Sequence, residues 1–219
     1  RYGSFYIIAE EAEKAVREIV EAAVDAPEGS EERKFGDVYA SFMDEARIEQ
    51  LGATPLRPLL DEVDAVDNVG QFLATAGQLE RKGTSGFFQI FIDNDPGDPE
   101  RYVVFLEQGG LGLPDESYYR EDGFADIREK YVSYLETILG LAGLDHAAQR
   151  ARRIFDLETK IASHHWDNVR SRDSEATYNL EKWKEVAAAA KNAGLDLDAW
   201  LDGVDVPKHS FKEVVVRQP

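Results

Sequence analysis

The stretch from residue 87 to residue 106 contains two short runs rich in aromatic and β-branched side chains. Residues 87–92 read Phe-Phe-Gln-Ile-Phe-Ile, and residues 102–106 read Tyr-Val-Val-Phe-Leu. Between them, residues 93–99 read Asp-Asn-Asp-Pro-Gly-Asp-Pro, which is a run of turn-forming residues. The pattern predicts a β-hairpin at about residues 87–106 with a long connecting loop.

On both sides of the hairpin, apolar residues recur at the three- and four-residue steps of amphipathic helices. The predicted helices cover residues 4–25, 30–52, 54–66 and 68–82 before the hairpin, and 124–142, 145–170 and 179–194 after it. Their apolar faces are expected to point inward. In the first two helices these faces consist of Phe5, Ile8, Ala12, Ala15, Ile19 and Ala23, and of Phe35, Val38, Phe42 and Met43.

These elements predict a mainly α fold, a multi-helix domain with one β-hairpin. A last strand-like segment, Phe211–Val216, has no evident partner, and two strands alone are marginally stable. We therefore expect the fold to be incomplete without a C-terminal part that supplies further structure.

Composition excludes several classes of function. The 219 residues carry 43 acidic and 25 basic side chains, a formal charge of −18, which repels nucleic-acid phosphates. The chain has no apolar run near the ~20 residues that a membrane span needs, so no membrane segment is predicted. The absence of cysteine excludes thiol catalysis, disulfides and cysteine zinc sites.

Catalytic motifs are also missing. A zincin helix needs two histidines four residues apart, and none of His146, His164, His165 and His209 has such a partner. The chain lacks Gly-x-Ser-x-Gly and Ser-x-x-Lys nucleophile motifs. The glycine-rich residues 109–114 lack the spacing of a nucleotide loop, so a structural turn is predicted there. No catalytic residue and no metal ligand is predicted, although an unrelated acidic enzyme that uses some of the many carboxylates stays open.

Several stretches resemble, in order and spacing, the N-terminal half of the neprilysin and endothelin-converting-enzyme family. They are Arg-Tyr-Gly-Ser-Phe at residues 1–5, residues 35–45 and 52–56, Gln-Gly-Gly-Leu-Gly-Leu-Pro at residues 108–114 with Tyr118-Tyr119, Glu-Thr-Lys-Ile-Ala at residues 158–162, and residues 172–179. Asp115-Glu116-Ser117 departs from the family's Ser-Arg-Asp, and Phe42 stands where animal members carry a disulfide cysteine. The lack of cysteine suggests a bacterial member, either cytoplasmic or exported.

The resemblance implies that the full-length parent is a zinc metalloendopeptidase that hydrolyses short peptides. Its zinc site, His-Glu-x-x-His with a downstream glutamate, would lie C-terminal to this chain, so this segment is expected to bind no zinc and to be inactive alone. Residues 1–219 would form the N-terminal, cleft-capping portion of the enzyme. Its expected partners are peptide substrates and the C-terminal catalytic domain of the same polypeptide. The alternative is a stand-alone helical module that binds peptides or proteins without catalysis.

The resemblance carries a substrate-binding role to two positions. Arg1 matches an arginine that pairs with the substrate's terminal carboxylate, which suits the planar guanidinium. Phe5 matches an aromatic residue that lines a hydrophobic substrate pocket. Simpler structural explanations exist for both positions, because Phe5 also fits the apolar face of the first helix and Arg1 stands at the chain end.

Overall fold

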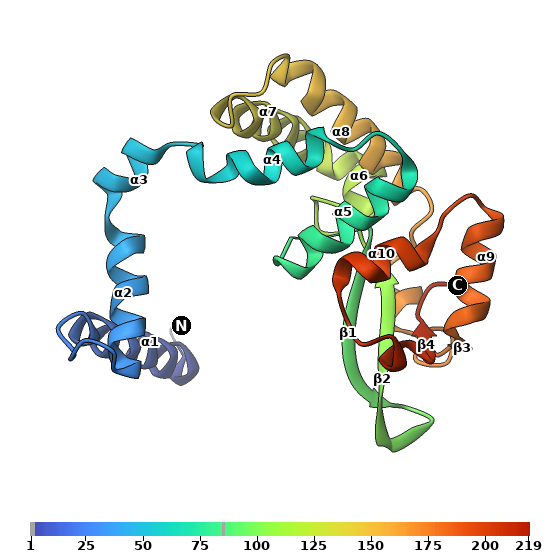
Figure 1. The fold of residues 1–219 in the computed structure, drawn as a ribbon, viewed down its shortest axis with the longest axis horizontal. Coiled ribbons are helices and arrows are strands. Elements are labelled where there is room, and N and C mark those ends of the chain that lie inside the picture. Colours follow the sequence, from blue (N-terminus) through green and yellow to red (C-terminus); the bar gives the residue numbers. More distant parts are fainter. Residues whose placement is uncertain (1–2, 85) are drawn as a thin grey trace. The chain divides into compact units, whose positions relative to one another are not determined.

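The computed structural model describes residues 3–84 and 86–219, in which helices predominate (Figure 1), and the mainly α prediction is thereby confirmed. The chain divides into two compact units, Arg1–Pro55 and Leu56–Pro219.

The first unit consists of α1 (Ser4–Ala23), α2 (Glu31–Met43) and α3 (Glu45–Leu51), and a 3₁₀ turn (Thr54–Leu56) follows them. Helices α1 and α2 cross where Gly36 lies against the backbone of Ala23, so closely that a Cβ at residue 36 would overlap the Ala23 carbonyl. The Asp44 side chain accepts a hydrogen bond from the backbone N of Arg47 and begins α3. The single helix predicted at residues 30–52 is therefore two.

The apolar faces of α1 and α2 are exposed within the first unit. Phe5 is 89% exposed and Phe42 is 75% exposed, whereas Ala23 is buried. The prediction that these faces point inward is wrong for the described structure. Two crossing helices cover each other only near their crossing point, and the described residues of this unit form no further layer over the rest.

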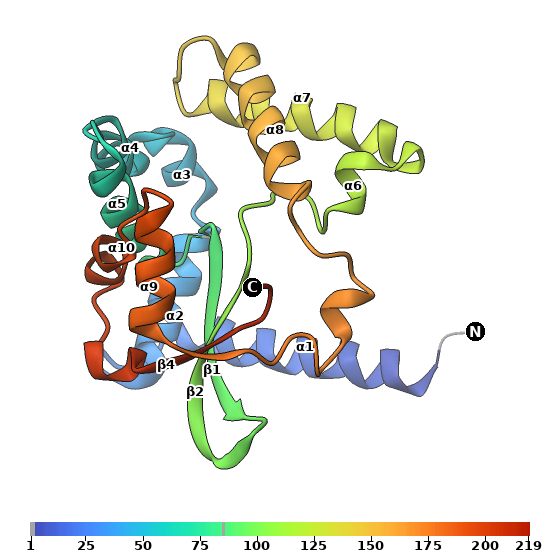
Figure 2. The ribbon, with the colours of Figure 1, turned by 90° about the vertical axis from the view of Figure 1, so that its right-hand side faces the viewer.

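The helices of the second unit are α4 (Arg57–Asp64), α5 (Val69–Arg81), α6 (Ser117–Arg120), α7 (Ala125–Leu141), α8 (Ala147–Ala162), α9 (Trp183–Asn192) and α10 (Leu197–Val204). Helices α7 and α8 lie side by side (Figures 1 and 2). The helix start predicted at residue 68 is confirmed, since the Asn68 side chain caps α5 by accepting a hydrogen bond from the backbone N of Gln71 at 2.9 Å. Helix α8 ends at Ala162 rather than near residue 170.

A four-stranded sheet, rather than one hairpin, lies beside these helices. Its strands β1 (Phe88–Asp95), β2 (Asp98–Gln108), β3 (Leu180–Lys182) and β4 (Glu213–Val216) follow the order β1-β2-β4-β3. Strand β4 pairs in parallel with β2 and antiparallel with β3. The last strand therefore finds both partners inside this chain, and the expectation that another domain must supply them is wrong.

The hairpin turn is also tighter than predicted, because Asp95 organises it. The buried Asp95 carboxylate accepts hydrogen bonds from the Gly97 backbone N at 2.8 Å, from the Tyr178 hydroxyl at 2.7 Å and from Arg101. Arg101 also pairs with Glu213 of β4 at 2.7 Å. The Tyr178 hydroxyl is the main group that lowers the pKa of Asp95 below its usual range. This network joins the hairpin to the later strands.

The core of the second unit lies where α5 and α10 pack against the sheet. Trp200 is 2% exposed, and its indole N–H donates to Glu80 of α5. Leu73, Leu201 and Val214 are buried with it. Helix α10 was not predicted. The predicted helix start at Asn179 is wrong as well, because the Asn179 side chain donates to the Val216 carbonyl and the chain forms β3 before α9 begins.

Candidate functional site

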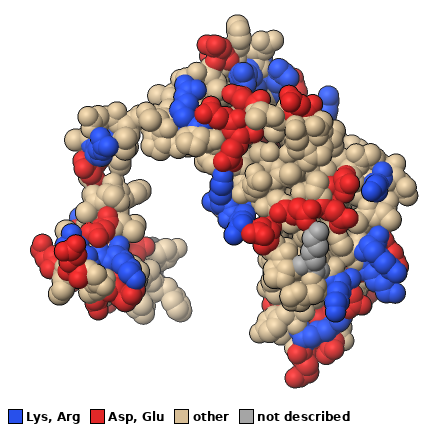
Figure 3. Space-filling model, in the orientation of Figure 1, with Lys and Arg blue, Asp and Glu red and all other residues tan. Residues whose placement is uncertain are grey.

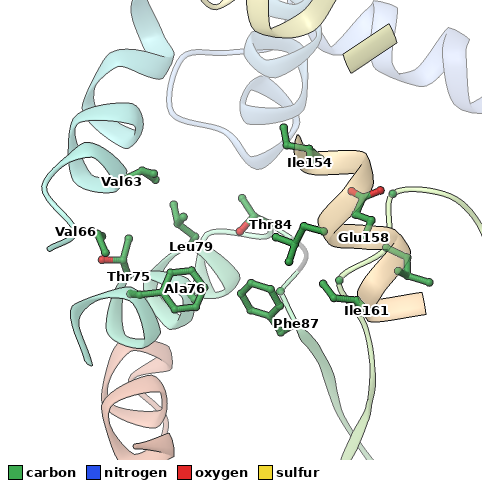
Figure 4. A pocket seen from close by; sticks show the side chains of 16 residues that line it. Val63, Val66, Thr75, Ala76, Leu79, Thr84, Phe87, Ile154, Glu158 and Ile161 are labelled. Atoms are coloured by element: carbon green, nitrogen blue, oxygen red, sulfur yellow. The ribbon is translucent and has the colours of Figure 1, made fainter. Parts of the chain in front are cut away.

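A pocket of about 780 Å³ lies inside the second unit between α4, α5 and α8. Figure 4 shows Val63, Leu79 and Phe87 on one side of it and Ile154 and Ile161 of α8 on the other. The lining is largely apolar, and the carboxylate of Glu158 is its one acidic group among the described residues. A concave apolar surface with few polar groups has the composition of a ligand-binding site.

The glycine-rich turn after β2 closes one side of this pocket. Gly110 has a φ of 84°, which favours glycine, and Gly112 lies so close to the Tyr131 hydroxyl that a side chain would overlap it. Gln108 fixes the start of the turn: its side chain donates to the Trp166 carbonyl at 3.0 Å and accepts from the Trp166 backbone N at 2.8 Å. The glycines here serve close packing, in keeping with the structural turn predicted from the sequence.

Two tyrosines hold Glu158 at the pocket wall. The Tyr119 hydroxyl donates to Glu158 Oε2 at 2.7 Å, and the Tyr131 hydroxyl donates to Oε1 at 3.0 Å. Tyr119 is buried and also accepts a hydrogen bond from the Leu113 backbone N at 3.1 Å. Helices α6, α7 and α8 are thereby connected through one carboxylate, and Tyr119 joins the glycine-rich turn to them. Tyr119 and Glu158 both belong to sequence motifs quoted above, but the sequence pattern does not predict this contact.

The tyrosine pKa values predict alkaline sensitivity. Burial raises the pKa of Tyr119 and of Tyr131 far above the usual 10, and the Glu158 carboxylate adds to both shifts. A raised folded pKa stabilises the protein fully below pH 10, and this stabilisation is lost as the pH rises from there toward the folded pKa. In urea unfolding between pH 9 and pH 11, we expect the Tyr119→Phe/Tyr131→Phe variant to lose less stability per pH unit than the wild type. An unchanged slope would contradict the prediction.

The histidines do not form a zinc site. Within the described ranges, no group of three or more His, Asp or Glu side chains could hold a metal ion. His165 is half-buried, and burial lowers its pKa, against the effect of a hydrogen bond with the Gly109 backbone. His164 precedes it directly on the chain, in the turn that follows α8. The residues present therefore do not fit a resident zinc ion.

The two predicted substrate-binding residues belong to the first unit. Arg1 lies outside the described residues. Phe5 lies in the first turn of α1 and is 89% exposed, so its ring is free to contact a ligand. The pocket residues all belong to the second unit.

Comparison with known proteins identifies the family. The N-terminal family model described as peptidase family M13 matches residues 1–219. The chain belongs to peptidase family M13. This finding confirms the resemblance to neprilysin and the endothelin-converting enzymes. The M13 chain is 31% identical to endothelin-converting enzyme 1 of Cavia porcellus over 192 residues, which cover 82% of the chain and 25% of that enzyme.

Solved protein structures support the same family assignment. Zinc metalloprotease Zmp1 of Mycobacterium tuberculosis, in complex with an inhibitor, is 35% identical with a TM-score of 0.92. The match covers 99% of the M13 chain and 34% of Zmp1. The PepO structure from Lactobacillus rhamnosis is 18% identical with a TM-score of 0.75, which shows the shared fold alone. The chain thus spans about a quarter to a third of the length of these relatives.

Among the residues that the structure describes, no helix has both the length and the hydrophobicity that crossing a bilayer requires.

Proposed function

We propose that this chain is the N-terminal gating and substrate-cleft portion of a zinc metalloendopeptidase that hydrolyses short peptides. The observation that carries the proposal is the family match over residues 1–219, together with the fold shared with Zmp1 over 99% of the chain. A helical portion that caps a substrate cleft would admit small, flexible peptides and hinder folded proteins.

The catalytic zinc would be bound by another part of the same polypeptide. This part of the proposal rests on the sequence, in which no two of the four histidines have the four-residue spacing of a zincin helix. In zinc peptidases, three protein ligands hold the metal, and the metal activates the attacking water. The residues of this chain would bind and orient the peptide and restrict access to it.

The exposed apolar faces of α1 and α2 suggest where the catalytic part docks. Phe5, Ile8 and Ile19 of α1 are at least 61% exposed, and Phe35, Val38 and Phe42 of α2 are at least 65% exposed. Apolar surface of this extent marks an interaction surface. We propose that the C-terminal catalytic domain of the same polypeptide covers it. Peptides would be the other partner, and nucleic acid is disfavoured by the charge of −18.

The test compares the 219-residue chain with the full-length polypeptide that contains it. We expect the full-length protein to bind one zinc ion and to cleave a fluorogenic peptide in a reaction that a chelator abolishes. The isolated chain should show neither bound zinc nor turnover. Zinc-dependent hydrolysis by the isolated chain would overturn the assignment of catalysis to another segment. A full-length protein without zinc and hydrolysis would favour the alternative, a helical binding module.

Phe5 gives a residue-level test of the cleft role. In the full-length enzyme, Phe5→Ala should raise KM for peptides with an apolar residue by about tenfold, since a buried phenyl ring contributes about 1.5–3 kcal/mol of binding. The matched control is Tyr102→Ala, because Tyr102 is an aromatic residue of β2 that is 73% exposed and lies outside the surface proposed for docking. Equal effects of the two substitutions on KM would contradict a specific role for Phe5.

A further inference from the structure

A second pocket lies along α8, next to the pocket of about 780 Å³ described above, which is called the main pocket. The second pocket, of about 420 Å³, is lined by Leu139 of α7 and by Arg150, Arg153, Ile154 and Leu157 of α8. Ile154 and Leu157 also line the main pocket. With 3.6 residues per turn, these two side chains and Ile161 lie on the same side of the helix. The two pockets therefore adjoin along α8, and together they are called the α8 groove.

The two ends of this groove carry opposite charges. In the first half of α8, Arg153 forms no hydrogen bond or ion pair with any described residue, and Arg150 uses only its Nε, on the Asp145 carbonyl at 2.9 Å. At the other end, the Glu158 carboxylate accepts hydrogen bonds only from the hydroxyls of Tyr119 and Tyr131 and has no cationic partner among the described residues. Basic and acidic side chains both lie over the α7–α8 region in Figure 3.

The spacing of these charges matches a short peptide. From Arg150 to Glu158 the helix rises by about 12 Å, at 1.5 Å per residue. An extended peptide advances about 3.3 Å per residue, so three or four residues bridge this distance. Between the charges lie Ile154 and Leu157, the latter 53% exposed and available for an apolar contact.

We propose that the α8 groove binds short peptides with free termini. The peptide's carboxylate would face Arg150 and Arg153, its ammonium group would face Glu158, and its apolar side chains would lie on Ile154 and Leu157. Guanidinium groups bind carboxylates with paired, charge-assisted hydrogen bonds, which favours this direction over the reverse. The inference rests on the proposed function only in taking peptides as the ligand class.

The first experiment titrates the isolated 219-residue chain with the tetrapeptide Ala-Leu-Leu-Ala, by calorimetry or NMR. The same peptide with an acetylated N-terminus and an amidated C-terminus is the comparison. We expect the free peptide to bind at least tenfold more tightly than the blocked one. Equal affinity, or no binding of either peptide, would overturn the proposal.

Variants locate the binding site. Arg153→Ala should weaken binding of the free peptide severalfold, whereas Arg152→Ala should not, because this neighbouring arginine points about 100° away on the helix and lines neither pocket. Leu157→Asp should abolish binding, with Leu141→Asp, an exposed leucine on α7, as its control. Equal losses in a variant and its control would overturn the proposed site.

The last experiment measures peptide binding to the full-length polypeptide and tests whether the groove is open there. Retained binding there, with the same loss in Arg153→Ala, supports the proposal. Lost binding would show that another segment of the polypeptide fills the groove, and would overturn it. None of these measurements depends on zinc or hydrolysis, so their failure is distinguishable from failure of the proposed peptidase function.

Discussion

Replacing Gly77 with alanine is expected to lower the free energy of unfolding by about 3 kcal/mol, the upper end of what overpacking usually costs. Gly77 is buried on α5, where it faces α10. A Cβ at this position would overlap the Trp200 carbonyl and approach the backbone N of Val204. These atoms belong to a helix backbone, so no side chain can rotate to make room. The two helices would have to separate, and the core around Trp200 would open.

The matched control is Gly70→Ala in the same helix. A Cβ at Gly70 would meet only the Asn68 side-chain oxygen, at an ordinary 3.4 Å. Alanine restricts the unfolded chain more than glycine does, so this variant should gain about 0.5–1 kcal/mol. Urea unfolding followed by circular dichroism would measure both. Similar midpoints for the two variants would refute close packing of α5 on α10.

Elements with local signals were predictable from the sequence. Helix α5 begins at the predicted position because the Asn68 side chain accepts a hydrogen bond from the backbone N of Gln71, only three residues away. The strand segments of the hairpin were predicted for the same reason, since β-branched and aromatic residues mark them directly. The length of the loop was not predictable, because it depends on Asp95 meeting Tyr178 across 83 residues.

The sequence of α10 contains a helical pattern, although no helix was predicted there. Leu197, Trp200, Leu201 and Val204 have helical spacing, and Asp196 caps the helix through the backbone N of Asp198. The helix has only eight residues, and a segment that short is hard to distinguish from a loop by periodicity. Its stability comes from packing on α5, which no local pattern reports.

The candidate site was recognised in pieces and not as a site. The sequence identified the glycine-rich turn and the Glu158 motif through their resemblance to the M13 family. The contacts that join them span 39 residues for Tyr119 and 27 residues for Tyr131. Nothing in the chain indicates which of many carboxylates two tyrosines will approach, because that choice depends on how α7 packs on α8.

Replacing Glu158 with leucine should lower the free energy of unfolding by about 3 kcal/mol. Leucine has a similar volume, but it leaves the hydroxyls of Tyr119 and Tyr131 without an acceptor in a partly buried wall. Each such orphaned group costs about 1–3 kcal/mol, and the gain in apolar contact offsets part of the sum. Glu136→Leu on α7 is the control, since Glu136 is exposed and should change stability by less than about 0.5 kcal/mol.

A second substitution separates the lost hydrogen bonds from a simple change in packing. Adding Tyr131→Phe to Glu158→Leu removes one of the two orphaned hydroxyls and should restore about half of the lost stability, because removing both partners of a buried bond is nearly neutral. Tyr119→Phe should restore less, since it also deprives the Leu113 backbone N of its acceptor. Additive losses in the double variants, measured by urea unfolding, would contradict the network. The same Glu158→Leu protein should lose the preference of the α8 groove for a peptide with a free amino group, although the arginine end of the groove is intact. Glu158 therefore links the stability of the pocket wall to its ligand chemistry.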